Sequence, residues 1–311
     1  MRKLFKKRTY NFNFLGMRKI AFAVAITLLI ASVFSFVTRG LNYGVDFEGG
    51  VLLEISSEAP INMDKMRTDL GFLKELSIQS IGSGQEIQSV LIQTQSEEDG
   101  LTGPALVEKI KDVLGAGYTY DRVETIGPRI GQELKEKSLL ASVLALLAIS
   151  IYIWLRFEWP FAIGCMISLA YTLIIVVGCF SVFGWEFDMI VVAGLLSLAG
   201  YACNDTIVTY DRVRENLNKF RNMGKDELLN KSINETLSRT ILTGVTTLFV
   251  LLVLLFIGGQ TLKGFSISMT LGLIIGTCSS IFLAVPMLRY FDIYQVANKG
   301  DVSPFKNDYT K

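Results

Sequence analysis

The segment IAFAVAITLLIASVFSFV, residues 20–37, decides the fold class because it runs for 18 residues without a charged side chain. A helix needs about 20 mainly apolar residues to cross roughly 30 Å of hydrocarbon. Comparable apolar segments follow at about Ser138–Leu155, Phe161–Phe183, Phe187–Tyr210, Thr240–Ile257 and Phe265–Leu288. The sequence therefore predicts a membrane α-helical bundle of six transmembrane helices.

Composition excludes several classes of function. Half of the 311 residues are hydrophobic and only 19% are charged, and the mean hydropathy is +0.42. Histidine is absent, which removes the commonest general base, proton shuttle and metal ligand. The sequence contains no G-x-x-x-x-G-K-[ST] phosphate loop, so we expect no ATP hydrolysis by this chain.

The positions of the cysteines also argue against redox or metal chemistry. All four cysteines lie within apolar spans and none forms a C-x-x-C pair, so we expect them to pack as small buried residues: Cys165, Cys179, Cys203 and Cys278. We therefore expect a protein that is not an enzyme, with no catalytic residue, no metal site and no cofactor.

Orientation follows from the basic residues, because Lys and Arg are retained on the cytoplasmic side of a membrane. They precede the first span, follow the second and separate the fourth from the fifth: Arg2, Lys3, Lys6, Lys7, Arg8, Arg18, Lys19, Arg156, Arg212, Arg214, Lys219, Arg221, Lys225 and Lys231. Both termini are therefore expected in the cytoplasm. A cleaved signal peptide is the alternative for the first span, but residues 34–40 offer no A-x-A-like cleavage site, so we expect a retained anchor.

This topology predicts five parts of the chain. They are a basic cytoplasmic N-terminus at 1–19, the first helix at 20–37, an exported (periplasmic) domain at 38–137, helices two to six at 138–290 with a cytoplasmic loop at about 211–238, and a cytoplasmic tail at 291–311.

The exported domain has the alternating patterns of a small α+β fold. We expect strands at Val51–Ile55, Ser77–Ile81, Ser89–Gln95 and Tyr118–Ile126, and helices at Met63–Leu76 and Leu101–Leu114. The order βαββαβ is typical of a ferredoxin-like sandwich, inserted here between helices one and two.

Asp205 is the clearest charge inside a span, where a carboxylate costs roughly 2.5–3.5 kcal/mol on insertion scales. It is a candidate proton relay, because it could gain or lose a proton as its hydration changes. A static pair between helices is the alternative. Arg239 opens the fifth span from the same side and could pair with Asp205, or serve only as a topology anchor. Asp188 and Glu186 lie at span ends and are expected at the interface.

Four motifs resemble one family. The segments LNYGVDFEGG at 41–50, GPRIGQEL at 127–134 and GYACNDTIVTYDRVREN at 200–216, with Ser238-Arg239-Thr240, are similar to signatures of the SecF branch of the SecD-SecF export proteins. Ala202-Cys203 departs from the usual Ser-Ile of that family but leaves the aspartate in place. The family in turn resembles half of a resistance-nodulation-division transporter.

The resemblance implies a protein translocase accessory subunit in the bacterial plasma (inner) membrane. It would use the proton motive force, with protons as the coupling ion, to promote late steps of protein export. The implied partners are SecD, the SecYEG channel, the translocating polypeptide and membrane lipid, with YajC and SecA as further candidates and no nucleic acid. A small-molecule exporter of the resistance-nodulation-division type and a passive translocon scaffold are the alternatives.

The resemblance also assigns residues. Asp205 and Arg239 match the family's proton-coupling pair, and Asn204 and Thr206 flank the aspartate in the fourth-span motif. The signature turn comprises Gly44, Asp46, Phe47, Gly49 and Gly50. Its glycines are expected to allow a tight turn, with Asp46 capping it, and contact with cargo is the alternative.

Overall fold

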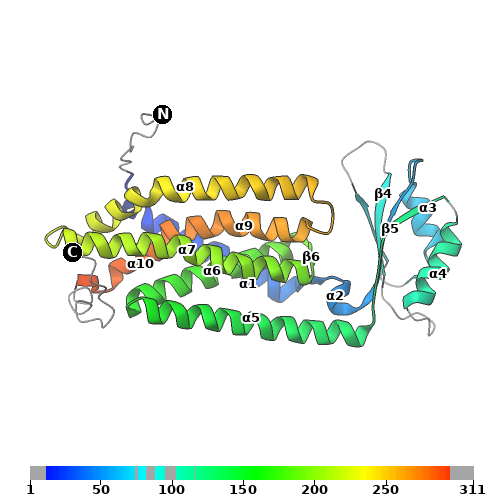
Figure 1. Cartoon of the computed structure of the whole chain (residues 1–311), viewed down its shortest axis with the longest axis horizontal. Helices are drawn as coiled ribbons and strands as arrows, with labels where there is room; N and C mark the ends of the chain where they lie inside the picture. Colours follow the sequence, from blue (N-terminus) through cyan, green and yellow to red (C-terminus); the bar gives the residue numbers. More distant parts are fainter. Residues whose placement is uncertain (1–11, 74–75, 82–87, 95–102, 116, 295–311) are drawn as a thin grey trace, which may run out of the picture. The chain divides into compact units, whose positions relative to one another are not determined.

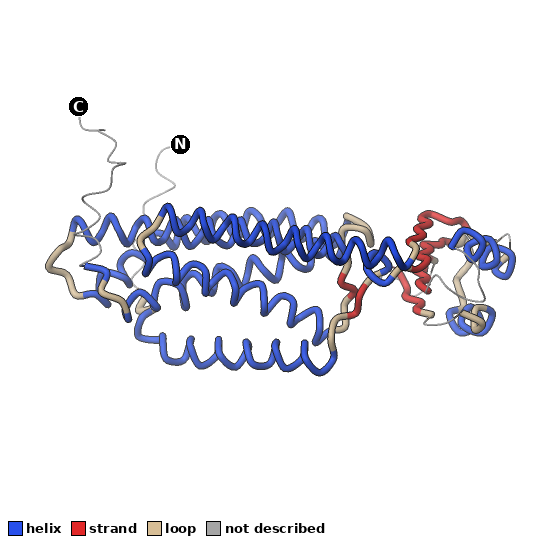
Figure 2. Tube along the Cα trace, turned by 90° about the horizontal axis from the view of Figure 1, so that it is seen from below, coloured by secondary structure: helices blue, strands red, loops and turns tan. Residues whose placement is uncertain are grey.

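The computed structural model describes residues 12–73, 76–81, 88–94, 103–115 and 117–294 of the chain. These residues form two compact units. The helical unit contains the described residues up to Gly40, Val143–Trp185 and the described residues from Ala193. The α+β unit contains the described residues of Leu41–Ser142 together with Glu186–Val192. Figure 2 separates the helices and strands by colour.

The prediction of six apolar spans is confirmed. Six helical segments of the described chain are long and apolar enough to cross a membrane. Four are single helices, α5 (Pro128–Arg156), α6 (Trp159–Phe183), α7 (Met189–Lys219) and α8 (Lys225–Ile257), and the first consists of the 3-10 turn η1 (Leu15–Met17) followed by α1 (Arg18–Arg39). The sixth is composite and consists of α9 (Lys263–Ser279), the π-helical turn η2 (Ser280–Ala284), α10 (Val285–Met287) and the 3-10 turn η3 (Leu288–Tyr290).

The helices extend beyond their apolar segments. Most of the connection predicted at about 211–238 is helical, because α7 continues to Lys219 and α8 already begins at Lys225. Both stretches are rich in Glu, Lys, Leu and Arg, which favour helix, and Gly224 with its extended backbone marks the start of α8. Likewise α5 begins at Pro128 rather than at Ser138, because proline suits the first turn of a helix.

Small and hydroxyl-bearing residues set the packing of the helical unit. A Cβ atom on Gly178 of α6 would lie 2.3 Å from the Cβ of Ser32 on α1, so these two helices touch through backbone and a small side chain. Close by, the hydroxyls of Ser35 and Ser181 are hydrogen-bonded at 3.0 Å. Helix α9 packs against both α6 and α8, and Figure 1 shows α8 and α9 side by side.

The α+β unit has a four-stranded antiparallel sheet of order β3-β4-β2-β5. Its elements are β2 (Gly50–Ser56), α3 (Met63–Asp69), β3 (Ser77–Ile81), β4 (Ser89–Thr94), α4 (Gly103–Leu114) and β5 (Thr119–Ile126). The first predicted helix is too long, because it ends at Asp69, where Leu70 leaves the helical conformation and is fully buried. The predicted positions 95, 101 and 102 lie outside the described residues.

The two faces of this sheet have different cores. Val51, Leu53 and Ile55 alternate along β2 and pack with residues of both α3 and α4, so both helices cover one face. Figure 1 shows α3 and α4 on the same side of the strands. On the opposite face Leu52 and Leu91 pack with Val45.

Three short elements of this unit were not predicted. They are β1 (Asn42–Tyr43), α2 (Val45–Glu48) and β6 (Glu186–Phe187). Strand β6 lies between the third and fourth spans and pairs in parallel with β1, which connects Asn42 with Glu186 and Tyr43 with Phe187. The segment between two membrane helices is therefore part of the α+β unit.

Replacing Gly178 with alanine tests the contact between α1 and α6. We expect Gly178→Ala to lower the free energy of unfolding by about 1–3 kcal/mol, because overpacking forces the two helices apart. The measurement is the thermal midpoint of the purified protein in detergent. Gly244→Ala in α8 is the matched control, since a Cβ there meets no atom within 4 Å. Equal midpoints for the two variants would contradict the contact.

Candidate functional site

Asp205 lies within the fourth span, on α7, and its carboxylate faces α8. Oδ1 accepts a hydrogen bond of 2.8 Å from the hydroxyl of Thr240 on α8. The second oxygen, Oδ2, is buried and has no hydrogen-bond partner in the described part of the chain. An unsatisfied buried carboxylate oxygen is unfavourable when the group is charged, and a proton on Oδ2 would remove that charge.

Arg239 is not bonded directly to Asp205. Its side chain is exposed, and no ion pair within 4.0 Å joins it to a described acidic residue. Its charge is near enough to act on the Asp205 carboxylate through space. The structure therefore brings the expected arginine to the neighbourhood of the aspartate, while the next residue, Thr240, makes the contact.

The residues on either side of Asp205 have opposite environments. Thr206 is buried, and its hydroxyl is 2.7 Å from the hydroxyl of Ser280, the first residue of η2. Asn204 is exposed although it lies within an apolar span. Thr206 thus connects α7 to the sixth span, and Asn204 faces away from the helical unit.

The π-helical turn in the sixth span also contacts α7. The backbone N–H of Val285 donates to the carbonyl of Ser280, five residues earlier, as in a π-helix. The carbonyl of Ala284 accepts a hydrogen bond of 3.0 Å from the fully buried hydroxyl of Tyr210. Pi-helical turns frequently occur at functional sites in helices. Here the irregular turn is stabilised by a residue that lies on the same helix as Asp205.

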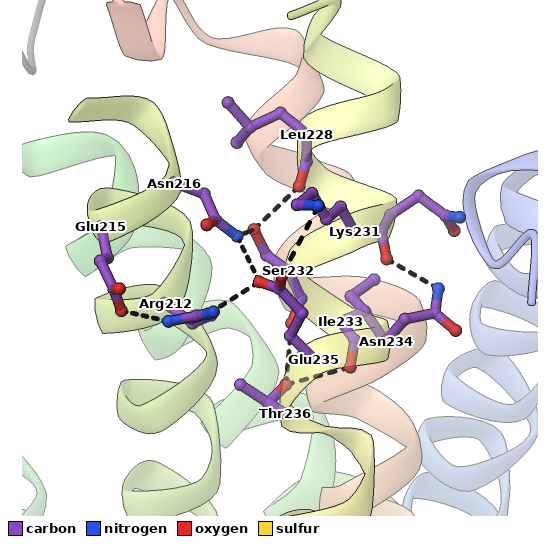
Figure 3. Close-up of polar contacts among 11 residues, drawn as sticks. Arg212, Glu215, Asn216, Leu228, Lys231, Ser232, Ile233, Asn234, Glu235 and Thr236 are labelled. Carbon is purple, nitrogen blue, oxygen red and sulfur yellow. Dashed lines mark hydrogen bonds and ion pairs between the residues drawn. The ribbon is translucent and has the colours of Figure 1, made fainter. Parts of the chain in front are cut away.

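A polar network joins the C-terminal part of α7 to the N-terminal part of α8 (Figure 3). Arg212 donates to Oε2 of Glu235 at 2.7 Å and also bonds to Glu215. Asn216 is completely buried and donates to the same Glu235 oxygen at 2.8 Å and to Ser232 at 2.9 Å. Glu235 and Ser232 were not predicted, because a polar helix end has no signal that identifies its partner.

The signature turn performs structural tasks within the α+β unit. Gly49 has a φ of 77°, and a Cβ there would lie 2.7 Å from Pro128. Phe47 is buried beside Tyr43 and Phe187. Asp46 does not cap its own turn, because its Oδ2 accepts the backbone N–H of Met189, the first residue of α7, at 3.0 Å.

The remaining signature glycines also make close approaches. Gly44 donates its N–H to the carbonyl of Phe187 at 3.0 Å. A Cβ on Gly50 would lie 2.5 Å from the carbonyl oxygen of Thr94.

Among the described residues, no cluster of three or more Cys, Asp or Glu side chains is arranged to hold a metal ion.

The family profiles and the relatives that match this chain are all described as SecD or SecF proteins. The family profile described as protein export membrane protein SecD/SecF, C-terminal, matches residues 106–293, and the profile of the SecD/SecF GG motif matches residues 34–61. The protein translocase subunit SecF of Vibrio alginolyticus is 40% identical over 282 residues, with 89% of each chain covered. That of Pseudomonas aeruginosa is 40% identical over 289 residues, covering 90% of this chain and 92% of the relative.

Solved structures show the same relationship. The crystal structure of SecDF, a translocon-associated membrane protein from Thermus thermophilus, superimposes with a TM-score of 0.80 at 32% identity over 90% of this chain. SecDF in a super-membrane-facing form gives a TM-score of 0.68 at 30% identity over 94% of this chain. This chain spans 38% and 40% of those two proteins, respectively. With its apolar spans, its signature turn and these relatives, the chain belongs to the SecD/SecF family of protein export membrane proteins.

Proposed function

We propose that this chain is the SecF-type subunit of a bacterial protein translocase, and that protonation of Asp205 couples the proton motive force to export. The observation that carries the proposal is the half-satisfied carboxylate, with Oδ1 bonded to Thr240 and Oδ2 buried without a partner. Moving one charge through a potential of 100 mV supplies about 2.3 kcal/mol, so a proton gradient is a sufficient source of work.

Membrane orientation follows from the charge distribution. We infer that the chain lies in the plasma (inner) membrane with cytoplasmic termini and an exported α+β domain. The basic residues gather at the C-terminal end of α7, at the N-terminal end of α8 and before α1. For the exported domain we infer the ferredoxin-like class, which is supported by the strand order β3-β4-β2-β5 with both helices on one face.

A SecD-type partner fits the exposed polar side of the fourth and fifth spans. Ser197, Gly200 and Asn204 are exposed along one side of α7, and Arg239 and Thr243 are exposed on α8. Polar side chains facing hydrocarbon are costly and are usually covered by protein. The SecDF chains are more than twice as long as the part matched here, which leaves room for a partner of comparable size.

Movement would follow from changes in contacts between α7 and its neighbours. Neutralising Asp205 alters its bond to Thr240 on α8, while Thr206 and Tyr210 connect α7 to the irregular sixth span. We infer that repacking of the fourth to sixth spans moves the exported domain. With SecD, this motion would draw a translocating polypeptide outward after the SecYEG channel and the SecA motor have begun transport, with YajC as a further candidate partner.

Removal of the Asp205 charge tests proton coupling. In cells whose only copy carries Asp205→Asn, we expect pulse-chase export of a secreted protein to slow several-fold at normal membrane levels of the variant, because the carboxamide cannot exchange a proton. Asp211→Asn is the matched control on the same helix, since Asp211 forms an exposed ion pair with Arg156 that contributes little. Export at the unmodified rate with Asp205→Asn would leave the passive scaffold as the better description.

The hydroxyl of Thr240 is expected to act through Asp205. Thr240→Val keeps the shape of the side chain but removes its hydrogen bond to the charged Asp205, and such a bond contributes about 1.5–3 kcal/mol. We therefore expect export to slow in Thr240→Val. Thr240→Ser keeps the hydroxyl and should export at the normal rate. Thr246→Val is the control, because among the described residues the Thr246 hydroxyl bonds only to backbone carbonyls of its own helix.

The double variant Asp205→Asn with Thr240→Val separates the two explanations for Thr240. It should export no more slowly than Asp205→Asn alone if the hydroxyl acts on the carboxylate. Additive losses of export rate would show that Thr240 has a separate role.

A further inference from the structure

Three carboxylates gather where the segment between the third and fourth spans joins the α+β unit. Asp46 comes from α2, Glu186 from β6, and Asp188 directly precedes α7. All three lie outside the six apolar helices. From sequence, Glu186 and Asp188 are only interfacial residues, and the proposed mechanism at Asp205 does not use them.

Backbone pairing and a helix cap hold this segment in place. We call residues 42–47 and 186–189 together the clasp. Strand β1 pairs with β6, and the N–H of Gly44 donates to the carbonyl of Phe187 at 3.0 Å. The N–H of Met189 donates to Oδ2 of Asp46 at 3.0 Å, so the first residue of α7 is bonded to the signature turn. The clasp therefore lies within the α+β unit and includes Met189, the first residue of the helix that carries Asp205.

Glu186 occupies a restricted position in the clasp. A Cβ on Gly44 would lie 2.7 Å from Oε1 of Glu186, so the side chain lies directly against the backbone of the signature turn. The same oxygen accepts a hydrogen bond of 3.3 Å from the side chain of Gln93 on β4. Glu186 thus contacts both the turn and the central part of the sheet.

The surroundings of Glu186 are unfavourable for a negative charge. Burial raises the pKa of Glu186 most, and the carboxylates of Asp188 and Asp46 raise it further, to about 7. Arg122 on β5 and the hydrogen bond from Gln93 act in the opposite direction. Arg122 is itself paired with Glu124 at 2.6 Å, which divides its charge between two carboxylates.

The other charged groups near the clasp do not reverse this balance. Lys135 of α5 lies over the ring of Tyr43, 3.6 Å from its centroid, and the Glu48 side chain is exposed. Burial also raises the pKa of Asp188, although the N–H of Val191 donates to its Oδ1 at 2.7 Å and stabilises its charged form. Asp46 accepts a hydrogen bond from the backbone N–H of Met189, which stabilises its charged form. Glu186 is therefore the group in the clasp with the weakest compensation of its charge.

We propose that Glu186 is a protonation switch of the clasp, which is closed when this residue is neutral and loosened when it is ionised. In the neutral form Oε1 still accepts from Gln93, and no charge faces Asp46 and Asp188. Ionisation places a third negative charge beside the other two, and the repulsion is relieved when β6 and the start of α7 separate from β1 and α2. The clasp would thereby make the packing of residues 186–189 within the α+β unit depend on the proton concentration around it.

The sign of the pH dependence follows from the raised pKa. The closed clasp binds the Glu186 proton more tightly than the open clasp, where the pKa returns towards its ordinary value of 4.5. The stability of the closed form is therefore fully present below about pH 4.5 and is lost as the pH rises to about 7. Between pH 5.5 and 8 these two pKa values predict an increase in the opening equilibrium of about 30-fold.

Hydrogen exchange of the full-length protein in lipid nanodiscs tests the proposal. Exchange of peptides covering residues 41–48 and 184–192 is measured at pH 5.5 and 8 and corrected for the intrinsic pH dependence of amide exchange. We expect opening of the wild-type clasp to increase by about 30-fold, because the pKa of Glu186 is about 7 in the closed form and near 4.5 in the open form. We expect Glu186→Gln to remain protected at both pH values, and Glu48→Gln, the matched control, to behave like the wild type.

Two outcomes would overturn the proposal. One is equal corrected exchange of the wild-type clasp at both pH values, and the other is an unchanged pH dependence in Glu186→Gln. A second variant, Asp188→Asn, keeps an acceptor for the N–H of Val191 but removes one neighbouring charge, so the midpoint of the opening should move to lower pH. A midpoint equal to that of the wild type would also contradict the switch. These measurements require no proton gradient and no export, so their outcome is independent of Asp205.

Discussion

The inability of hydrocarbon to form hydrogen bonds is the constraint on which the helical unit depends. Backbone groups within the spans must be satisfied inside the helices, which explains why every long apolar segment of this chain is helical. Some hydroxyl side chains are satisfied by one another between helices. Ser35 bonds to Ser181, and Ser168 bonds to Ser279 at 2.8 Å. Their small size also allows the close approach of helices that have no hydrophobic drive to associate in lipid.

Against this background, two irregular features of the spans involve contacts of α7. Asp205 retains a buried oxygen without a donor, and the sixth span contains a π-helical turn. Both would be eliminated if stability alone determined the sequence. The second is partly compensated by Tyr210 and Thr206, which bond to Ala284 and Ser280. Thr206 and Tyr210 lie on the same helix as Asp205, so the irregular turn and the carboxylate have α7 as a common neighbour.

The sequence alone predicts the apolar spans and the strands, but it does not predict which side chains from different segments contact one another. The six spans and the four strands of the sheet were predictable, because apolar length and alternation at period two are properties of single segments. The polar extensions of α7 and α8 were not, because hydropathy detects the membrane part of a helix and not its continuation. Asp205 was found as a charge in an apolar segment. Its contact with Thr240, and the cap of Asp46 on Met189, require knowledge of which segments meet.

The contacts between α7 and α8 differ in strength, and this difference determines how the pair can respond to a proton. At the polar end, Glu235 accepts from both Arg212 and the buried Asn216. Hydrogen bonds to charged groups contribute about 1.5–3 kcal/mol each, and leaving Asn216 buried without its partners would add a further cost. Within the span, the only bond between Asp205 and α8 among the described residues is that from Thr240. Protonation weakens this single bond by removing the charge that strengthens it. The polar end is therefore expected to remain joined while the membrane parts of the two helices separate, so that a proton produces a pivot about Glu235 and not a dissociation of α7 from α8.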